Sequence, residues 1–158
     1  MIYYEPMSAA GGPPAPMLGN ISRVSERVPA AGANVVRFPA GLPGFETCHA
    51  FVLMSPAANG PLQCLQAVDG QEASFLVIDP RRVLPEYRCE LTAADRHCLG
   101  SGNDEALLWL ALVSVEIDGT VTANLRAPVV INPARMTGRQ IVPQASIYPL
   151  RHVILGAE

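Results

Sequence analysis

Prolines and glycines are spread so densely along this chain that little room is left for a long helix. The 158 residues include 15 prolines and 13 glycines, and a proline inside a helix removes a hydrogen bond and clashes with the preceding turn. Between them lie short apolar runs bounded by turn signals such as Asn59-Gly60-Pro61 and Asp79-Pro80. This pattern predicts an all-β fold, a small and mostly antiparallel β-barrel-like (pseudobarrel) domain with one or two short helices.

The strand predictions rest on these apolar runs. Ala106–Ile117 is long enough for a buried helix, but its later part alternates between apolar and polar residues, which favours a strand. One short helix is predicted after Thr92, because Thr92 and Asp95 have capping-box spacing and Gly100 follows the expected end. The segments predicted to supply strand residues are Val35–Phe38, Phe51–Met54, Leu62–Val68, Ser74–Ile78, Ala106–Ile117, Leu125, Val129–Ile131 and Gln140–Val142.

The hairpin around Asp118-Gly119 is predicted to have a three-residue loop, Ile117-Asp118-Gly119. A two-residue loop would set Val115 opposite Thr122 and mix core with solvent faces. Because strand side chains alternate with period two, a shift of one residue turns every side chain to the other face. The loop also places Gly119 where a left-handed residue is wanted. The predicted partners are Val115–Val121, Ser114–Thr122, Val113–Ala123 and Glu116–Thr120.

Residues 1–33 differ in composition from the rest of the chain. The stretch Ala10–Pro16 holds clustered prolines and glycines that no regular element accommodates. We therefore expect residues 1–33 to form a flexible Pro/Ala/Gly-rich N-terminal tail and residues 34–158 to form one domain. Hydrophobic residues make up 49% of the chain, enough for that domain to bury a substantial core.

No pattern in the sequence is typical of a catalytic, metal or cofactor site. The four cysteines form no CxxC pair, and the chain has no GxSxG, GxGxxG or P-loop motif. A zinc site built from Cys48-His49 and His97-Cys98 is disfavoured, because adjacent residues in a strand point to opposite faces. We therefore expect no catalytic residues, no metal and no cofactor.

The sequence predicts a cytoplasmic protein without a membrane partner. Its cysteines are expected to be free thiols, it has no convincing signal peptide, and no apolar stretch reaches about 18 residues. The net charge of −3 does not favour nonspecific contact with nucleic acid. Charge is unevenly distributed, however. Residues 119–157 contain no acid, whereas the stretch from Asp69 to Glu105 contains eight: Asp69, Glu72, Asp79, Glu86, Glu90, Asp95, Asp104 and Glu105. An acidic face of this kind would meet a basic partner.

Five motifs in one order resemble the flagellar assembly factor FliW family. They are Phe38-Pro-Ala-Gly-Leu-Pro-Gly-Phe-Glu46, Leu65-Gln-Ala-Val68, Phe75-Leu-Val-Ile-Asp-Pro80, Thr122-Ala-Asn-Leu-Arg-Ala-Pro-Val-Val-Ile-Asn132 and Tyr148-Pro-Leu-Arg-His152. The resemblance covers residues 34–155, and the tail before residue 34 is extra.

The resemblance implies a small β-barrel-like protein without enzymatic activity, a cytoplasmic chaperone-like factor that binds flagellin. It also implies binding to CsrA, a dimeric RNA-binding repressor of flagellin translation, so that repression is relieved. No direct contact with nucleic acid is expected, and the free protein is expected to be a monomer. For the partner-binding surface the acidic stretch offers four candidates: Glu86, Glu90, Asp104 and Glu105.

Other residues in the motifs are predicted to serve the structure. Gly41-Leu42-Pro43-Gly44-Phe45 has the composition of a tight reversal in which at least one glycine has a positive φ angle. Asn124 and Asn132 flank Pro128, where strands begin or end, and their amides are expected to bond backbone groups. Direct contact of these amides with flagellin or CsrA is the functional alternative. For the whole protein the alternative is a small β-barrel enzyme or cofactor carrier, for instance a flavin-binding protein.

Overall fold

The computed structural model describes residues 34–55, 60–102 and 106–156, which form nine strands and two short helices. The tail predicted for residues 1–33 lies outside the described residues. The helices are α3 (Pro80–Val83) and α4 (Ala93–Leu99). The strands are β1 (Val35–Arg37), β2 (Ala50–Met54), β3 (Leu62–Ala67), β4 (Ser74–Ile78), β5 (Leu108–Val115), β6 (Val121–Ala123), β7 (Val129–Asn132), β8 (Thr137–Gln140) and β9 (His152–Leu155).

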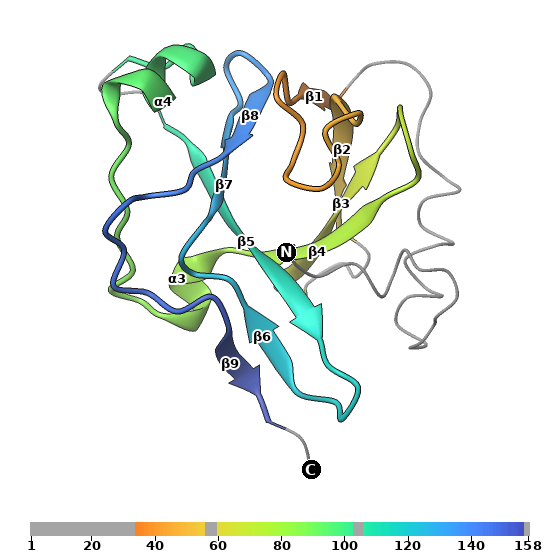
Figure 1. Cartoon of the computed structure of the whole chain (residues 1–158), viewed down its shortest axis with the longest axis vertical. Helices are drawn as coiled ribbons and strands as arrows, with labels where there is room; N and C mark the ends of the chain where they lie inside the picture. The colour runs from red at the N-terminus through yellow and green to blue at the C-terminus, as the bar shows by residue number, and fades with distance from the viewer. Residues whose placement is uncertain (1–33, 56–59, 103–105, 157–158) are drawn as a thin grey trace.

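Seven of these strands close into a barrel, in the order β4-β3-β2-β1-β8-β7-β5, because β5 also pairs with β4. Every pairing in this ring is antiparallel except β1 with β8, which is parallel and has a single partner pair, Arg37 and Thr137. Figure 1 shows the barrel in the upper part of the molecule, with α3 and α4 at one side. The predicted all-β, mostly antiparallel barrel with short helices is confirmed.

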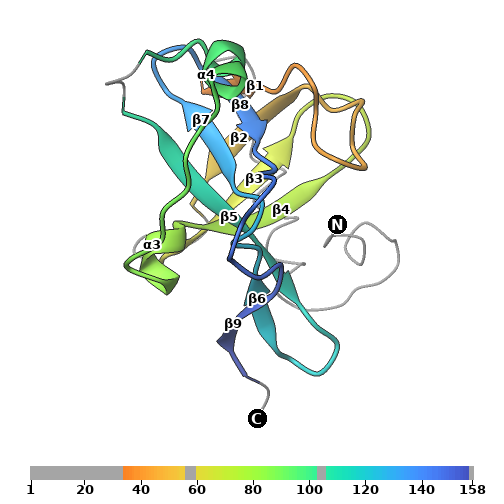
Figure 2. The same cartoon turned by 60° about the vertical axis from the view of Figure 1, so that its left-hand side comes forward.

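A three-stranded arm extends from the barrel where β5 leaves β4. The far half of β5 pairs with β6, and β6 pairs with β9 (Figures 1 and 2). The hairpin partners are Val113–Ala123, Ser114–Thr122 and Val115–Val121, and the Glu116 N–H donates to the Thr120 carbonyl at 2.7 Å. The predicted three-residue loop is therefore confirmed, with Gly119 at a φ of 92°.

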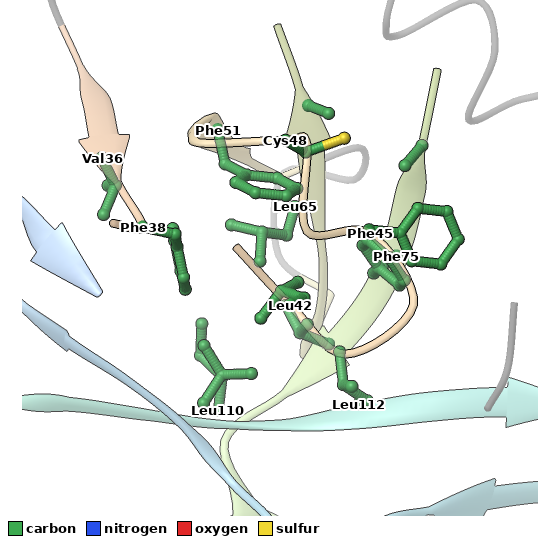
Figure 3. Packing of buried hydrophobic residues seen from close by; sticks show 14 of the residues in the cluster. Val36, Phe38, Leu42, Phe45, Cys48, Phe51, Leu65, Phe75, Leu110 and Leu112 are labelled. Carbon is green, nitrogen blue, oxygen red and sulfur yellow. The ribbon is translucent and has the colours of Figure 1, made fainter. Parts of the chain in front are cut away.

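The barrel interior is filled by aromatic and aliphatic side chains from the turn-rich segment after β1 and from the surrounding strands (Figure 3). Phe38 meets Phe51 edge to face with ring centroids 5.0 Å apart, and Phe45 meets Phe75 in the same way at 5.2 Å. Edge-to-face pairs of this kind add stability beyond the apolar area that they bury. The Gly41–Phe45 reversal is thus part of the core.

The short helices form where local capping permits. Thr92 and Asp95 form the complete capping box at the start of α4, and Gly100 ends the helix with a left-handed φ of 65°, as predicted. For α3 the signal lies in Asp79-Pro80, which was predicted only as a turn. The Asp79 side chain accepts a hydrogen bond from the Arg81 N–H, and proline is favoured in the first helical position.

After the hairpin, two strand predictions were wrong and one strand was missed. Gln140–Val142 was predicted as a strand, but β8 ends at Gln140 and begins at Thr137, with Gly138 inside it. Leu125 lies outside the strands, where it is fully buried and its N–H donates to the Pro149 carbonyl. No strand was predicted at β9, which is completed only by pairing with β6.

Candidate partner-binding surface

Glu86 and Glu90 lie on the connection between α3 and α4, and both are exposed. The connection alternates: Tyr87 is buried and Cys89 is half-buried, whereas Arg88 and Glu90 face outward. The Tyr87 hydroxyl anchors this segment by donating to the Leu125 carbonyl at 2.8 Å. The structure therefore exposes Glu86 and Glu90 on one surface segment, four residues apart in the chain.

Neither carboxylate is engaged within the part of the chain that the structure describes. The two ion pairs found there join Arg139 to Asp95 and Arg151 to Glu116. Both Glu86 and Glu90 are thus available to a partner. The other two predicted partner-binding residues, Asp104 and Glu105, lie outside the described residues.

Several other acids of the same stretch serve the fold. Asp69 Oδ1 accepts hydrogen bonds from the N–H groups of His49 and Ala50, at 2.9 and 3.0 Å. Asp79 and Asp95 cap α3 and α4. These carboxylates hold turns and helix ends together, so the acidic surface available to a partner is smaller than the sequence count suggests.

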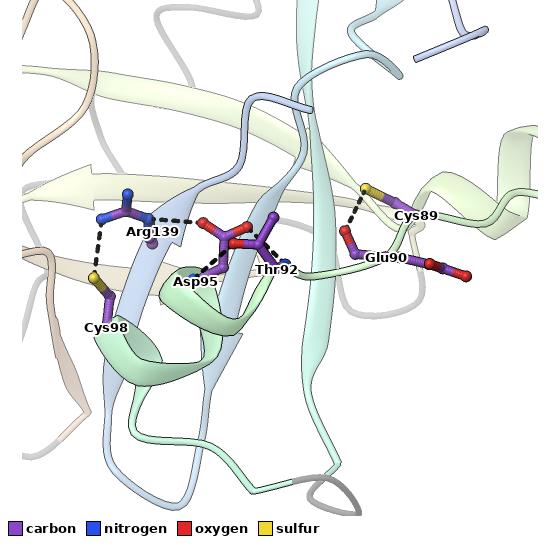
Figure 4. A network of polar contacts seen from close by, with 6 residues as sticks. All are labelled: Cys89, Glu90, Thr92, Asp95, Cys98 and Arg139. Carbon is purple, nitrogen blue, oxygen red and sulfur yellow. Dashed lines mark hydrogen bonds and ion pairs between the residues drawn. The ribbon is translucent and has the colours of Figure 1, made fainter. Parts of the chain in front are cut away.

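Arg139 on β8 fastens α4 to the barrel (Figure 4). Its Nε lies 3.3 Å from Asp95 Oδ1, and its Nη1 donates to Cys98 Sγ at 3.3 Å. In Figure 4 the side chain of Glu90 stands apart from this network and points away from it. The network therefore stabilises the helix and leaves Glu90 outside it.

The Gly41–Phe45 reversal has the backbone geometry that the sequence predicted. Gly41 and Gly44 have positive φ angles of 67° and 85°. The Phe45 N–H donates to the Leu42 carbonyl at 2.7 Å, which closes the turn. Leu42 and Phe45 are buried, while Pro43 is exposed. The turn points two apolar side chains into the barrel and leaves its proline at the surface.

Asn124 and Asn132 both bond backbone groups, as expected. Asn124 Oδ1 accepts from the N–H groups of Arg126 and Ala127, each at 3.0 Å, in the bend that leads to the buried Pro128. Asn132 is fully buried: its amide donates to the Leu99 carbonyl at 2.9 Å and accepts from the Ala134 N–H. Asn132 thereby ties the end of α4 to β7. Contact of either amide with a partner stays an untested alternative.

Three of the four cysteines are poorly suited to nucleophilic catalysis. Burial raises the pKa of the Cys64 thiol to about 12 and also raises the pKa values of Cys48 and Cys89, so the reactive thiolate is disfavoured at neutral pH. Cys98 is exposed and contacts Arg139. Within residues 34–55, 60–102 and 106–156, no group of three or more His, Cys, Asp or Glu side chains is placed to hold a metal ion.

An apolar surface that was not predicted from the sequence lies along β9 and the segment before it. In sequence this region has the composition of turns, and β9 forms there by pairing with β6. The exposed apolar side chains are Ile147, Leu150, Val153, Ile154 and Leu155. The sequence of β9 carries no period-two signal that could have found it, since Val153, Ile154 and Leu155 are all apolar and all exposed. No helix in the described part of the chain is long and apolar enough to cross a membrane.

Comparison with known proteins places these features in a family. A sequence model described as "FliW protein" matches residues 21–154. The chain belongs to the FliW family. Flagellar assembly factor FliW of Syntrophotalea carbinolica is 39% identical over 119 residues, which cover 75% of this chain and 85% of that protein. Flagellar assembly factor FliW of Geotalea uraniireducens is 38% identical over 119 residues, covering 75% and 72%.

The fold agrees with that of the FliW family as well. The crystal structure of a flagellar assembly factor FliW superimposes with a TM-score of 0.74 at 28% identity, covering 82% of this chain and 91% of that one. The resemblance inferred from five motifs is thereby confirmed. The sequence match begins at residue 21, within the segment expected to be a tail; the boundary at residue 34 remains a proposal.

Proposed function

We propose that this protein is a non-enzymatic flagellar assembly factor of the cytoplasm, which binds flagellin and antagonises the translational repressor CsrA. Membership of the FliW family carries the proposal, since the relatives bear the name flagellar assembly factor. Binding to CsrA would release the flagellin messenger and allow its translation. Binding to flagellin would withdraw the factor from CsrA, so that translation follows export of flagellin.

The proposed contact with CsrA is electrostatic. CsrA has a basic surface that binds RNA, and an acidic protein docked beside it raises the electrostatic cost of bringing phosphates there. The exposed carboxylates Glu86 and Glu90, which form no described ion pair, support this contact. Asp104 and Glu105 belong to the same proposal on the basis of their sequence position.

The contact has to be local, because both signs of charge occur on this segment. Arg81, Arg82 and Arg88 are exposed close in sequence to Glu86 and Glu90. At physiological salt, exposed charges farther apart than about 8 Å are largely screened from one another. Glu86 and Glu90 would therefore act by facing basic groups of CsrA directly, and the net charge of the whole protein would add less.

The test is reconstitution from purified components. The full chain is mixed with CsrA that holds labelled flagellin messenger, and release of RNA is followed by fluorescence anisotropy. We expect a stable complex with CsrA, release of RNA, and re-binding of RNA after flagellin is added. If the chain forms a complex with neither CsrA nor flagellin, the proposal is refuted. A visible absorption band in the purified protein would instead favour the flavin-binding alternative.

A further inference from the structure

The connection between α3 and α4, at one side of the barrel, presents charges of alternating sign (Figures 1 and 2). Glu86, Arg88 and Glu90 are exposed, whereas Tyr87 and Cys89 between them are buried and half-buried. Four residues along a chain separate the α-carbons of Glu86 and Glu90 by no more than about 14 Å. One partner surface of ordinary size is therefore wide enough to meet all three charges.

Arg88 does not neutralise the glutamates on either side of it. Neither of the two ion pairs found in residues 34–55, 60–102 and 106–156 includes Glu86, Arg88 or Glu90. Opposite charges that lie two residues apart and do not pair within the chain are all open to a partner. The surface therefore offers a cation as well as two acids.

The backbone of Arg88 is held in place from a distant part of the chain. Its N–H donates to the Tyr148 hydroxyl at 3.0 Å. The Tyr148 ring lies against the Tyr87 ring with centroids 4.6 Å apart, and the Tyr148 carbonyl accepts from Arg126 Nε at 3.0 Å. None of these contacts uses the Arg88 guanidinium. The fold thus fixes where this cation stands and leaves its charge outside the packing.

A cation between two acids discriminates among basic partners. A uniformly basic surface is attracted by Glu86 and Glu90 but repelled by Arg88, and like charges set opposite one another suppress wrong partners. A partner that places a carboxylate opposite Arg88 replaces that repulsion with a third ion pair. The segment therefore fits a surface whose charges run positive, negative, positive.

We propose that Arg88 determines the register and specificity of the CsrA contact, by facing a carboxylate of CsrA that lies between the basic groups facing Glu86 and Glu90. The inference rests on the proposed function and deepens it, because basic character alone then does not select the partner. It also reverses the expectation from net charge. Removing Arg88 makes the segment more acidic and yet weakens the complex.

Arg88→Ala tests this reversal with two labelled ligands, CsrA and an oligolysine peptide, whose binding is followed by fluorescence anisotropy at low salt. The variant keeps the N–H that bonds Tyr148. We expect it to bind CsrA about threefold more weakly or worse, the effect of losing one exposed ion pair. It should bind oligolysine more tightly, because a repulsion is removed. Both differences should shrink at high salt.

Two further variants control for packing and for net charge. Arg88→Met keeps an unbranched apolar side chain without the charge and should weaken CsrA binding as Arg88→Ala does. Arg82→Ala removes the same charge from an exposed position in α3 and should not weaken it.

Tighter or unchanged CsrA binding by Arg88→Ala overturns the inference and leaves the proposed function in place. The same holds for full affinity in Arg88→Met, for equal weakening by Arg82→Ala, and for a shift of both ligands in one direction. If the unmodified chain binds no CsrA, the CsrA part of the proposed function fails and the inference fails with it.

Discussion

The ring of Phe38 packs directly over the α-carbon of Gly138, where any side chain would collide with three ring carbons. Phe38 follows β1 and Gly138 lies in β8, so this contact bridges the parallel seam that has only one pair of partners, Arg37 and Thr137. The missing side chain lets the ring cross the seam. A side chain packed against a bare backbone thus closes the barrel at the place with the fewest strand partners.

Gly138→Ala should therefore lower the free energy of unfolding by about 1–3 kcal/mol, the usual cost of overpacking a core. Gly102→Ala is a suitable control, since a methyl group there meets nothing within 4 Å. Denaturant unfolding of both variants measures the difference. Equal stability of the two would show that the ring can move aside, and that the contact does not constrain the seam.

The two glycines of the Gly41–Phe45 reversal should respond differently to valine. Both have positive φ, but a Cβ at Gly41 would lie 2.8 Å from the Phe45 carbonyl oxygen, whereas the space around Gly44 is open. Gly44→Val should cost about 1–3 kcal/mol through backbone strain alone. Gly41→Val should cost more, because strain and collision add. Chemical denaturation ranks the two; an equal or reversed order would contradict the assigned turn geometry.

Asn132→Ala should destabilise the protein by about 1–3 kcal/mol, because it leaves the buried Leu99 carbonyl and Ala134 N–H without their partner. Asn124→Ala should cost less, about 1 kcal/mol, because Asn124 is only half-buried. Melting temperatures and partner affinities are measured together. A variant that keeps its stability but loses affinity for flagellin or CsrA would assign that amide to binding.

The parts of the fold that depend on local chemistry could be predicted from the sequence. The period-two pattern around Asp118 sets the hairpin register, and the Thr92 capping box sets the start of α4. The errors arise where the decisive neighbour is distant. Glycine disfavours a strand on sequence grounds, and Phe38, whose ring makes Gly138 necessary in β8, lies one hundred residues earlier. β9 likewise depends on a neighbour that is distant in sequence, because it is a strand only through its pairing with β6.

In the candidate partner-binding surface, too, some features could be predicted from local sequence and others depend on distant residues. Exposure of Glu86 and Glu90 follows from their polar character and their place between turns. The structural use of Asp69 could not be predicted, because its partners His49 and Ala50 are twenty and nineteen residues away in sequence. Counting acids along a stretch therefore overestimates how many of them a partner can meet.

Deleting residues 1–20, which precede the family match, should leave the melting temperature and partner binding nearly unchanged. Deleting residues 1–31 should give the same result if the domain begins at residue 34. The pair of truncations separates the two boundaries by differential scanning calorimetry. A drop of many degrees for the longer deletion alone would show that residues 21–31 belong to the folded domain.

The most direct measurement of the proposed CsrA contact compares charge reversals in the RNA-release assay at low salt. Glu86→Arg with Glu90→Arg should weaken CsrA binding and RNA release, and the defect should shrink at high salt, where exposed charges are screened. Glu72→Arg, compared with each single reversal, controls for the change in net charge, since Glu72 is exposed on a different loop. Equal affinity and equal RNA release by the double variant and the unmodified protein at low salt would contradict the account.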